Sequence, residues 1–107
     1  MDSDQDRLLG KIREFRALAE ERYPIRKLLL YGSHARGEAR TDSDIDVALI
    51  MDVHDIRERI RTTAALYTLA HQVDPAIEPR CISSHDYENC EPASILGEIK
   101  RTAIEVP

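Results

Sequence analysis

Two short apolar segments constrain the fold of this chain more than any other feature of its sequence. The longest apolar runs are Leu28–Leu30 and Val47–Met51. Both are far too short to cross a membrane, and the surrounding segments 25–31 and 44–51 carry the pattern of buried strands. Gly32 ends the first strand, because glycine tolerates the backbone conformations of a tight turn.

Apolar side chains at helical spacing predict one helix before and one helix after these strands. The first helix covers residues 4–21 and the second covers residues 54–72. Their predicted core-facing positions are Leu8, Ile12, Phe15 and Ala19 in the first helix, and Ile56, Ile60, Ala64, Tyr67 and Ala70 in the second. Tyr67 is therefore expected in the core.

The rest of the chain predicts a third strand at residues 76–82, a last helix at 93–102 and an extended segment at 103–106. Pro79 lacks a backbone N–H, which places the third strand at an edge or a bulge. This order of elements predicts a single domain over residues 1–107. Its class is α/β (α+β), with a small sheet covered by helices.

The formal net charge of −5 bears on the possible ligands. Proteins that bind nucleic acid irrespective of sequence carry a basic surplus that neutralises phosphates. This chain has no such surplus, so we expect no direct nucleic-acid partner and only a small, metal-bound nucleotide. The N-terminus is acidic and polar, unlike a secretory signal, and no membrane association is expected. Cys81 and Cys90 lack the spacing of metal ligands, and the expected location is cytoplasmic.

Asp44 and Asp46 form a candidate metal-binding pair. Residues two apart on a strand share a face, so the two carboxylates can converge on one divalent ion or on two neighbouring ions. Mg²⁺ takes one or two protein carboxylates and completes its shell with water and phosphates. Acidic residues at the start of a strand are also common as simple solvated groups.

Gly32 and Ser33 form a candidate phosphate-binding turn. Gly32 has no Cβ to obstruct a phosphate, and Ser33 would open a helical turn at residues 33–36 whose free N–H groups favour anions. By itself, Ser33 could equally serve only as a helix cap. A Gly-Ser pair followed after ten residues by Asp-x-Asp is expected by chance in roughly one of a thousand chains of this length. The combination predicts a site for a metal-bound nucleoside triphosphate.

The segment Gly32–Val47, GSHARGEARTDSDIDV, resembles the signature of the minimal nucleotidyltransferases of the DNA polymerase β-like superfamily. The resemblance covers residues 23–106, with the helix in residues 1–22 leading into it. It implies the nucleotidyltransferase (polymerase β-like) fold, a small mixed sheet flanked by helices. It also implies that Gly32 and Ser33 hold the β- and γ-phosphates of ATP.

By the same resemblance, Asp44 and Asp46 bind Mg²⁺. Arg36 falls where the family has an arginine near the phosphates, although it could also be a solvated loop residue. His34 departs from the family, whose members often carry arginine there. It would weaken the binding of the triphosphate or make that binding pH-sensitive, or it would have no role.

Family members that catalyse transfer use a third carboxylate on a strand beside the Asp-x-Asp strand, as a base or a metal ligand. Glu78 is our candidate for a catalytic and metal-binding residue. Ile77 and Cys81 can face the core while Glu78 points the other way. Asp74 is the alternative, and a chain without a working third carboxylate would bind nucleotide without catalysis.

The resemblance finally implies a function. Stand-alone minimal nucleotidyltransferases are frequently paired with a HEPN-domain ribonuclease toxin, and act as antitoxins by adding AMP to a tyrosine of that toxin. We therefore expect an Mg²⁺-dependent transferase that uses ATP and takes its acceptor from a partner or a second copy. The alternatives are a non-catalytic antitoxin that acts by complex formation, and an adenylyltransferase of a small molecule such as an antibiotic.

Overall fold

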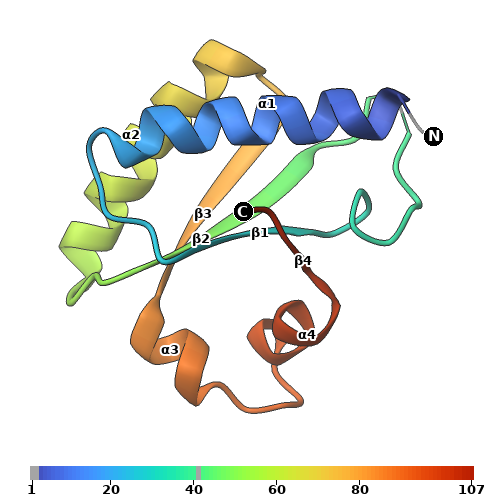
Figure 1. Ribbon diagram of the computed structural model, residues 1–107. Helices are drawn as coiled ribbons and strands as arrows, with labels where there is room; N and C mark the ends of the chain where they lie inside the picture. Colours follow the sequence, from blue (N-terminus) through green and yellow to red (C-terminus); the bar gives the residue numbers. More distant parts are fainter. Residues whose placement is uncertain (1–2, 41) are drawn as a thin grey trace.

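In the computed structural model, which describes residues 3–40 and 42–107, a four-stranded mixed sheet forms the centre of the molecule (Figure 1). Its strands are β1 (Lys27–Tyr31), β2 (Ile45–Met51), β3 (Ile77–Ser83) and β4 (Ile104–Glu105). Across the sheet they lie in the order β3-β2-β1-β4. β1 is antiparallel to both β2 and β4, whereas β2 and β3 are parallel.

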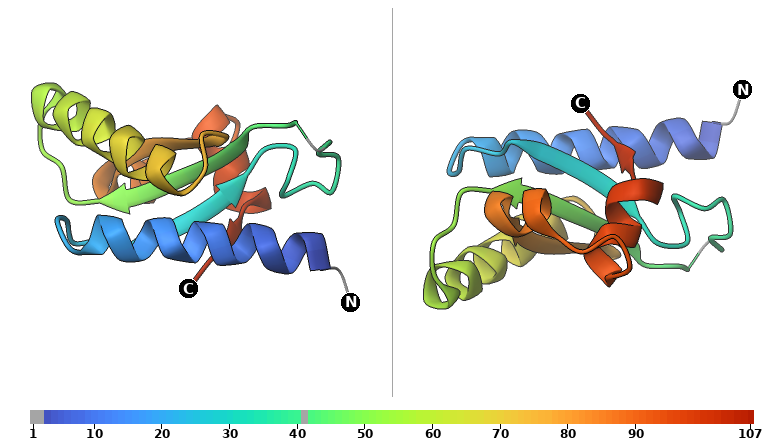
Figure 2. Two further views of the ribbon diagram at one scale, coloured as in Figure 1. Left: turned by 90° about the horizontal axis from the view of Figure 1, so that it is seen from above. Right: turned by 90° about the horizontal axis from the view of Figure 1, so that it is seen from below.

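Helices cover both faces of this sheet (Figures 1 and 2). They are α1 (Ser3–Glu20), α2 (Ile56–Val73), α3 (Ser84–Asn89) and α4 (Ile95–Thr102). α1 and α2 pack on one face, and α2 forms the crossover that joins the parallel strands β2 and β3. α3 and α4 lie on the opposite face, where Ile99 of α4 joins a second, smaller core. None of the helices in the described part of the chain is long and apolar enough to span a membrane.

The alternation of side chains along each strand divides the core into two. Leu28, Val47 and Ile77 point toward α1 and α2, where they pack with fully buried residues such as Ile12 and Phe15. Leu29, Ala48, Ile50 and Ile82 point to the other face and pack with Ile99. Asp46 and Glu78 occupy the same alternating positions along β2 and β3 as this second set, so they lie on the face of the sheet that carries α4. They lie outside the part of that face that α4 covers.

The structure confirms the predicted fold class and most of the predicted elements. The first three strands, the three longer helices and the terminal extended segment all occur, with ends that differ by at most two residues. β3 is an edge strand, as Pro79 predicted. The helix α3 was not predicted, because its sequence SHDYEN is polar and buries none of its side chains.

The core-facing stripe predicted for α2 is wrong. Ile56 and Ile60 are 63% and 61% exposed, and Tyr67 is only half-buried. The side chains that α2 buries are Thr62, Leu66, Leu69 and Ala70. Of the predicted positions only Ala70 is buried, because α2 carries apolar residues on two sides and packs its leucine side on the sheet. The other apolar side stays open.

Candidate active site

The predicted phosphate turn and the predicted metal-binding strand meet at one point. Gly32 follows β1 directly, and Tyr31, the last residue of β1, lies opposite Asp46 on β2. Gly32 adopts a φ of +77°, and a Cβ at this position would stand 2.5 Å from Oδ2 of Asp46. Only glycine therefore allows the turn to pass this close to the carboxylate without displacing it.

The turn after Gly32 leaves polar groups available to a ligand. Arg36 donates its N–H to the carbonyl of Gly32 at 3.2 Å, which closes one helical turn that does not continue into a helix. The N–H groups of Ser33, His34 and Ala35 donate to no acceptor among the described residues. The Ser33 hydroxyl also has no hydrogen-bond partner there. Three consecutive free N–H groups beside a carboxylate suit a phosphate that is bound together with a cation.

Carboxylates form a row across the strands next to this turn. Asp46 on β2 is the register partner of Glu78 on β3, and both are half-buried. Asp44 precedes Asp46 by two residues and is exposed. Burial, and then the like charges of Asp44 and Glu78, raise the pKa of Asp46 above its ordinary value, whereas Arg80 and His34 act in the opposite direction. Asp44 and Glu78 thus lie close enough to Asp46 for their charges to affect its ionisation.

Two other predicted residues have different surroundings. Asp74 sits at the C-terminal end of α2, where Lys11 of α1 donates a hydrogen bond to its Oδ2 at 2.6 Å and the Ala76 N–H donates to its Oδ1 at 2.8 Å. Asp74 therefore connects α1 to the turn between α2 and β3. Arg36 is exposed, and its Nε pairs with Glu38 at 3.2 Å.

Two residues at the site were not assigned to it from the sequence. Arg80 follows Glu78 by two residues on the same face of β3, is exposed, and forms no salt bridge with a described residue. The Tyr67 hydroxyl of α2 donates to Oε2 of Glu78 at 3.4 Å. Burial, and then Glu78, raise the pKa of Tyr67 above its ordinary value. For Arg80 the available signal is the period-two alternation along β3. Tyr67 offers no such signal, because its helical spacing predicts a position in the core.

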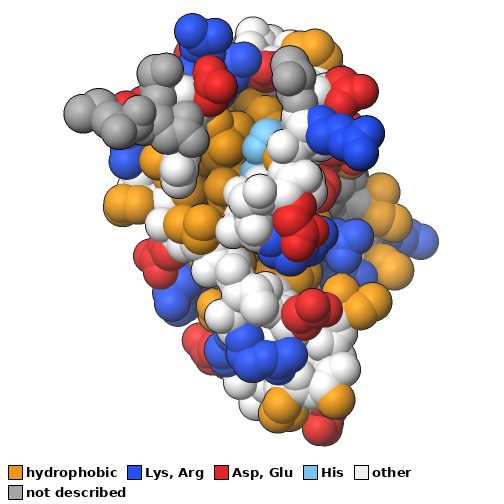
Figure 3. Space-filling model, turned by 90° about the vertical axis from the view of Figure 1, so that its right-hand side faces the viewer, with side chains coloured by type: hydrophobic (Ala, Val, Ile, Leu, Met, Phe, Trp, Pro, Cys, Tyr) orange, Lys and Arg blue, Asp and Glu red, His pale blue; other side chains and the backbone are white. Residues whose placement is uncertain are grey.

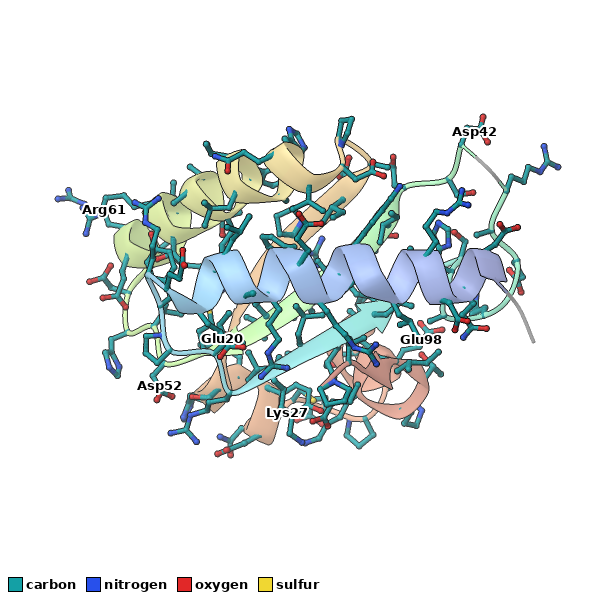
Figure 4. All side chains as sticks on the ribbon, turned by 45° about the horizontal axis from the view of Figure 1, so that its top comes forward. Glu20, Lys27, Asp42, Asp52, Arg61 and Glu98 are labelled. Atoms are coloured by element: carbon teal, nitrogen blue, oxygen red, sulfur yellow. The ribbon has the colours of Figure 1, made fainter. Side chains whose placement is uncertain are left out.

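The loop between β1 and β2 is held near the site by His34. Its Nε2 lies 3.4 Å from the carbonyl oxygen of Ser43. Asp42, by contrast, points outward from the loop, away from the sheet (Figure 4). Viewed from this end of the molecule, basic and acidic side chains are interspersed rather than gathered into a patch of one sign (Figure 3). This surface offers no continuous basic track.

Comparison with known families decides what kind of domain this is. The family model described as a nucleotidyltransferase domain matches residues 12–89. This chain belongs to that family. The matched part of the nucleotidyltransferase domain includes the Gly32-Ser33 turn and the carboxylates Asp44, Asp46 and Glu78. The chemistry of the domain is therefore transfer of a nucleotidyl group.

A solved structure supports the same fold for this nucleotidyltransferase domain. The crystal structure of a candidate nucleotidyltransferase from Sulfolobus solfataricus, at 1.40 Å resolution, superposes with a TM-score of 0.67. The match covers 96% of this chain and 82% of the other, at 14% sequence identity. No curated protein matches the sequence. At this sequence identity, the likeness to the solved structure shows a shared fold and no more.

The donor set of the nucleotidyltransferase domain fits a hard cation that brings most of its own ligands. Within residues 3–40 and 42–107, no three of its His, Cys, Asp and Glu side chains are grouped closely enough to enclose an ion. Mg²⁺ needs only one or two protein carboxylates and takes its other ligands from phosphates and water. Asp46 and Asp44 supply such oxygens beside a turn with free N–H groups, so these residues would hold it.

Proposed function

We propose that this domain transfers AMP from Mg²⁺-bound ATP to a hydroxyl group of a partner protein. The observation that carries the proposal is the close approach of Gly32 to Asp46, where a Cβ on Gly32 would stand 2.5 Å from Oδ2 of the carboxylate. It joins a turn with free N–H groups to a row of carboxylates, and both halves of a metal-bound triphosphate find partners there. The choice of ATP follows from the family resemblance of the segment 32–47.

The residues of the turn would bind the leaving group. The N–H groups of Ser33, His34 and Ala35 and the Ser33 hydroxyl have no other partner among the described residues and would donate hydrogen bonds to the β- and γ-phosphates. Arg80 carries a positive charge on the face of Asp46 and Glu78, where a guanidinium can hold the oxygens of the phosphoryl group under attack. When bound, a divalent cation neutralises charge that develops on the phosphates.

In this proposal Glu78 acts on the acceptor. The acceptor hydroxyl oxygen forms a bond to the α-phosphorus, and the bond from this phosphorus to the oxygen bridging to the β-phosphate breaks. The hydroxyl proton passes to the Glu78 carboxylate, and pyrophosphate leaves. The hydrogen bond from Tyr67 holds Oε2 of Glu78 and leaves its other oxygen available for this proton.

The partner in this proposal is a HEPN-domain toxin whose tyrosine accepts AMP, which makes the domain an antitoxin. The support for this partner is the resemblance of the segment 32–47 to the minimal nucleotidyltransferases. A protein acceptor also agrees with the mixed charge around the site, which does not form a track for nucleic acid.

Mass spectrometry of the partner tests the proposal directly. The purified domain is incubated with ATP, MgCl₂ and the product of the gene next to its own, where this proposal expects the HEPN-domain partner. The expected product is partner protein that has gained the mass of AMP on a tyrosine. Asp46→Asn should abolish this product, whereas Asp42→Asn, a matched change at an outward-pointing acid of the same loop, should preserve it.

A second candidate is an antitoxin that binds nucleotide and neutralises its partner without catalysis. The hydrogen bond from Tyr67 favours it, because this bond occupies Oε2 of Glu78, one of the two oxygens that a third carboxylate would use. In that case Asp46→Asn would still inhibit the toxin and no AMP would appear on it. Inhibition that is lost together with the mass gain would exclude this candidate.

A further inference from the structure

An apolar groove of about 690 Å³ runs along the open edge of β3, between α2 and α4. These helices lie on opposite faces of the sheet, so the edge strand forms the floor between them. The walls are apolar and are made of Ile60, Ala64 and Tyr67 from α2, and Ile95, Leu96 and Ile99 from α4.

The two isoleucines at the rim face solvent. Ile60 is 61% exposed and Ile95 is 75% exposed, and both belong to the few large apolar side chains that the described residues expose. Contiguous exposed apolar surface marks a contact surface, whereas single scattered apolar side chains do not. The groove is also where the open apolar side of α2 lies.

The groove leads directly into the candidate active site. Tyr67, part of one wall, donates its hydrogen bond to Glu78. Arg80 lines the groove, and its positive charge opposes the rise in the pKa of Asp46. A ligand lying in the groove would therefore end beside the carboxylate that is placed to take the acceptor proton.

The order of groups across the sheet determines the side from which the acceptor approaches. The turn that would hold the leaving pyrophosphate follows β1, Asp46 lies on β2, and Glu78 lies on β3. In phosphoryl transfer the attacking and leaving oxygens lie roughly in line on opposite sides of the phosphorus. With the leaving group on the β1 side, the attacking hydroxyl comes from the β3 side, where the groove opens.

We propose that the groove binds an extended segment of the acceptor polypeptide, with an apolar side chain between Ile60 and Ile95 and the acceptor hydroxyl beside Glu78. The inference rests on the proposed function and adds to it the surface that selects the acceptor. The reacting bonds and the proton are those described for that function.

Charge in the groove favours a polypeptide with an acidic residue next to its apolar one. The lining contains two arginines and one aspartate, so it is net positive in a chain whose net charge is −5. Arg80 is assigned to the phosphoryl group in the proposed function, so the cation for a peptide carboxylate is Arg59, whose exposed pair with Asp86 is long, at 3.8 Å. Two separated arginines between apolar walls do not follow a run of phosphates, which argues against nucleic acid.

The test uses a display library of random linear peptides selected on the wild-type protein. Peptides that also bind the double variant Ile60→Asp/Ile95→Asp are removed. Both side chains are largely exposed, so the variants should fold, and melting curves check this. Ile56→Asp is the matched control, since Ile56 is 63% exposed on the same helix but does not line the groove.

We expect peptides with an apolar residue close to an acidic one to be enriched. Their affinity, measured by fluorescence anisotropy, should fall about tenfold or more in Ile60→Asp and Ile95→Asp and stay within about twofold in Ile56→Asp. ATP binding, measured separately, should be unchanged in all three variants. If the wild type shows no ATP binding or no AMP transfer, the proposed function is refuted, and the peptide result still stands by itself.

Three results would overturn the inference. In the first, no peptide distinguishes the wild type from the double variant. In the second, a single-stranded oligonucleotide binds and is released by the same substitutions. In the third, sedimentation shows a dimer that Ile60→Asp and Ile95→Asp dissociate, which would assign the groove to a second copy of the chain.

Discussion

Replacing Gly32 by alanine is expected to destabilise the fold through two separable contributions. The first is the backbone, because Gly32 has a φ of +77° and an L-residue in this region costs about 1–2 kcal/mol. The second is the contact with Asp46. A Cβ 2.5 Å from Oδ2 must push this oxygen back to at least 3.4 Å, where ordinary contacts begin. Turning the carboxylate off its preferred rotamer costs about 0.5–1.5 kcal/mol more.

Gly37→Ala is the matched control for the first contribution. Gly37 has nearly the same φ, +72°, but nothing lies within 4 Å of a Cβ built there. Gly37→Ala should therefore lose only about 1–2 kcal/mol, and Gly32→Ala about 1 kcal/mol more. In a domain of this size 1 kcal/mol corresponds to a shift in Tm of about 4–8 °C.

Urea denaturation of the two variants and of their combinations with Asp46→Ala measures the difference. Asp46→Ala removes the oxygen that meets the new Cβ, so in this background the excess cost of Gly32→Ala over Gly37→Ala should disappear. Equal losses of stability for Gly32→Ala and Gly37→Ala with Asp46 present would refute the close approach. So would an excess that persists in the Asp46→Ala background.

Three further predictions concern charged groups. The pKa of Asp46 is raised by burial and by neighbouring carboxylates, so ionisation of Asp46 lowers the stability of the fold as the pH rises through the raised pKa. The Asp46→Asn variant should therefore have a higher Tm than the wild type at pH 7. Below pH 3.8, the ordinary value, the two Tm values should be equal. The pKa of Asp74 is lowered, chiefly by the hydrogen bond from Lys11, so the ionised form stabilises the fold above pH 3.8 and this is lost as the pH falls through the lowered pKa. Asp74→Asn should thus cost about 1 kcal/mol at pH 7 and nothing in strong acid, as measured by urea denaturation. In steady-state transfer assays Arg80→Ala should reduce kcat/KM about 10- to 100-fold, whereas Arg36→Ala, which only breaks an exposed pair with Glu38, should change it less than about threefold.

Strand parity is the part of the site that could be predicted from the sequence. Apolar residues at Ile45 and Val47 assign Asp46 to the opposite face, and Ile77 and Cys81 do the same for Glu78. Because this alternation is local, one strand at a time suffices. The alignment of Asp46 with Glu78 depends on how α2 packs and on the register that it imposes on β3, which no local pattern contains.

The side of α2 that packs on the sheet could not be predicted from spacing alone. Ile60 and Tyr67 repeat at helical intervals, and so do Leu66 and Leu69. Two apolar sides compete for one sheet, and the outcome depends on the crossover between β2 and β3. The sequence therefore identifies α2 as a helix but does not show that its isoleucines are exposed.

Pairing in the loop decides the difference between Arg36 and Arg80. The phosphate role that the family resemblance gives Arg36 stays a prediction, and in the structure the Nε of Arg36 pairs with Glu38, two residues later. Arg80 was overlooked although it shares the parity of Glu78, because a lone arginine next to a proline carries no motif. Salt-bridge partners are a property of the folded loop and lie beyond a motif comparison.

Pro79 has a consequence for how this protein behaves at high concentration. An uncovered edge strand is a template on which further strands can add, and this is a common start of aggregation. On β3 the proline removes one N–H from the outer ladder, and the exposed charge of Arg80 follows it. At the other edge, β4 is only two residues long. Both edges therefore resist uncontrolled strand addition. The β3 edge can stay accessible to a polypeptide that binds transiently, without self-association of the molecule through this edge.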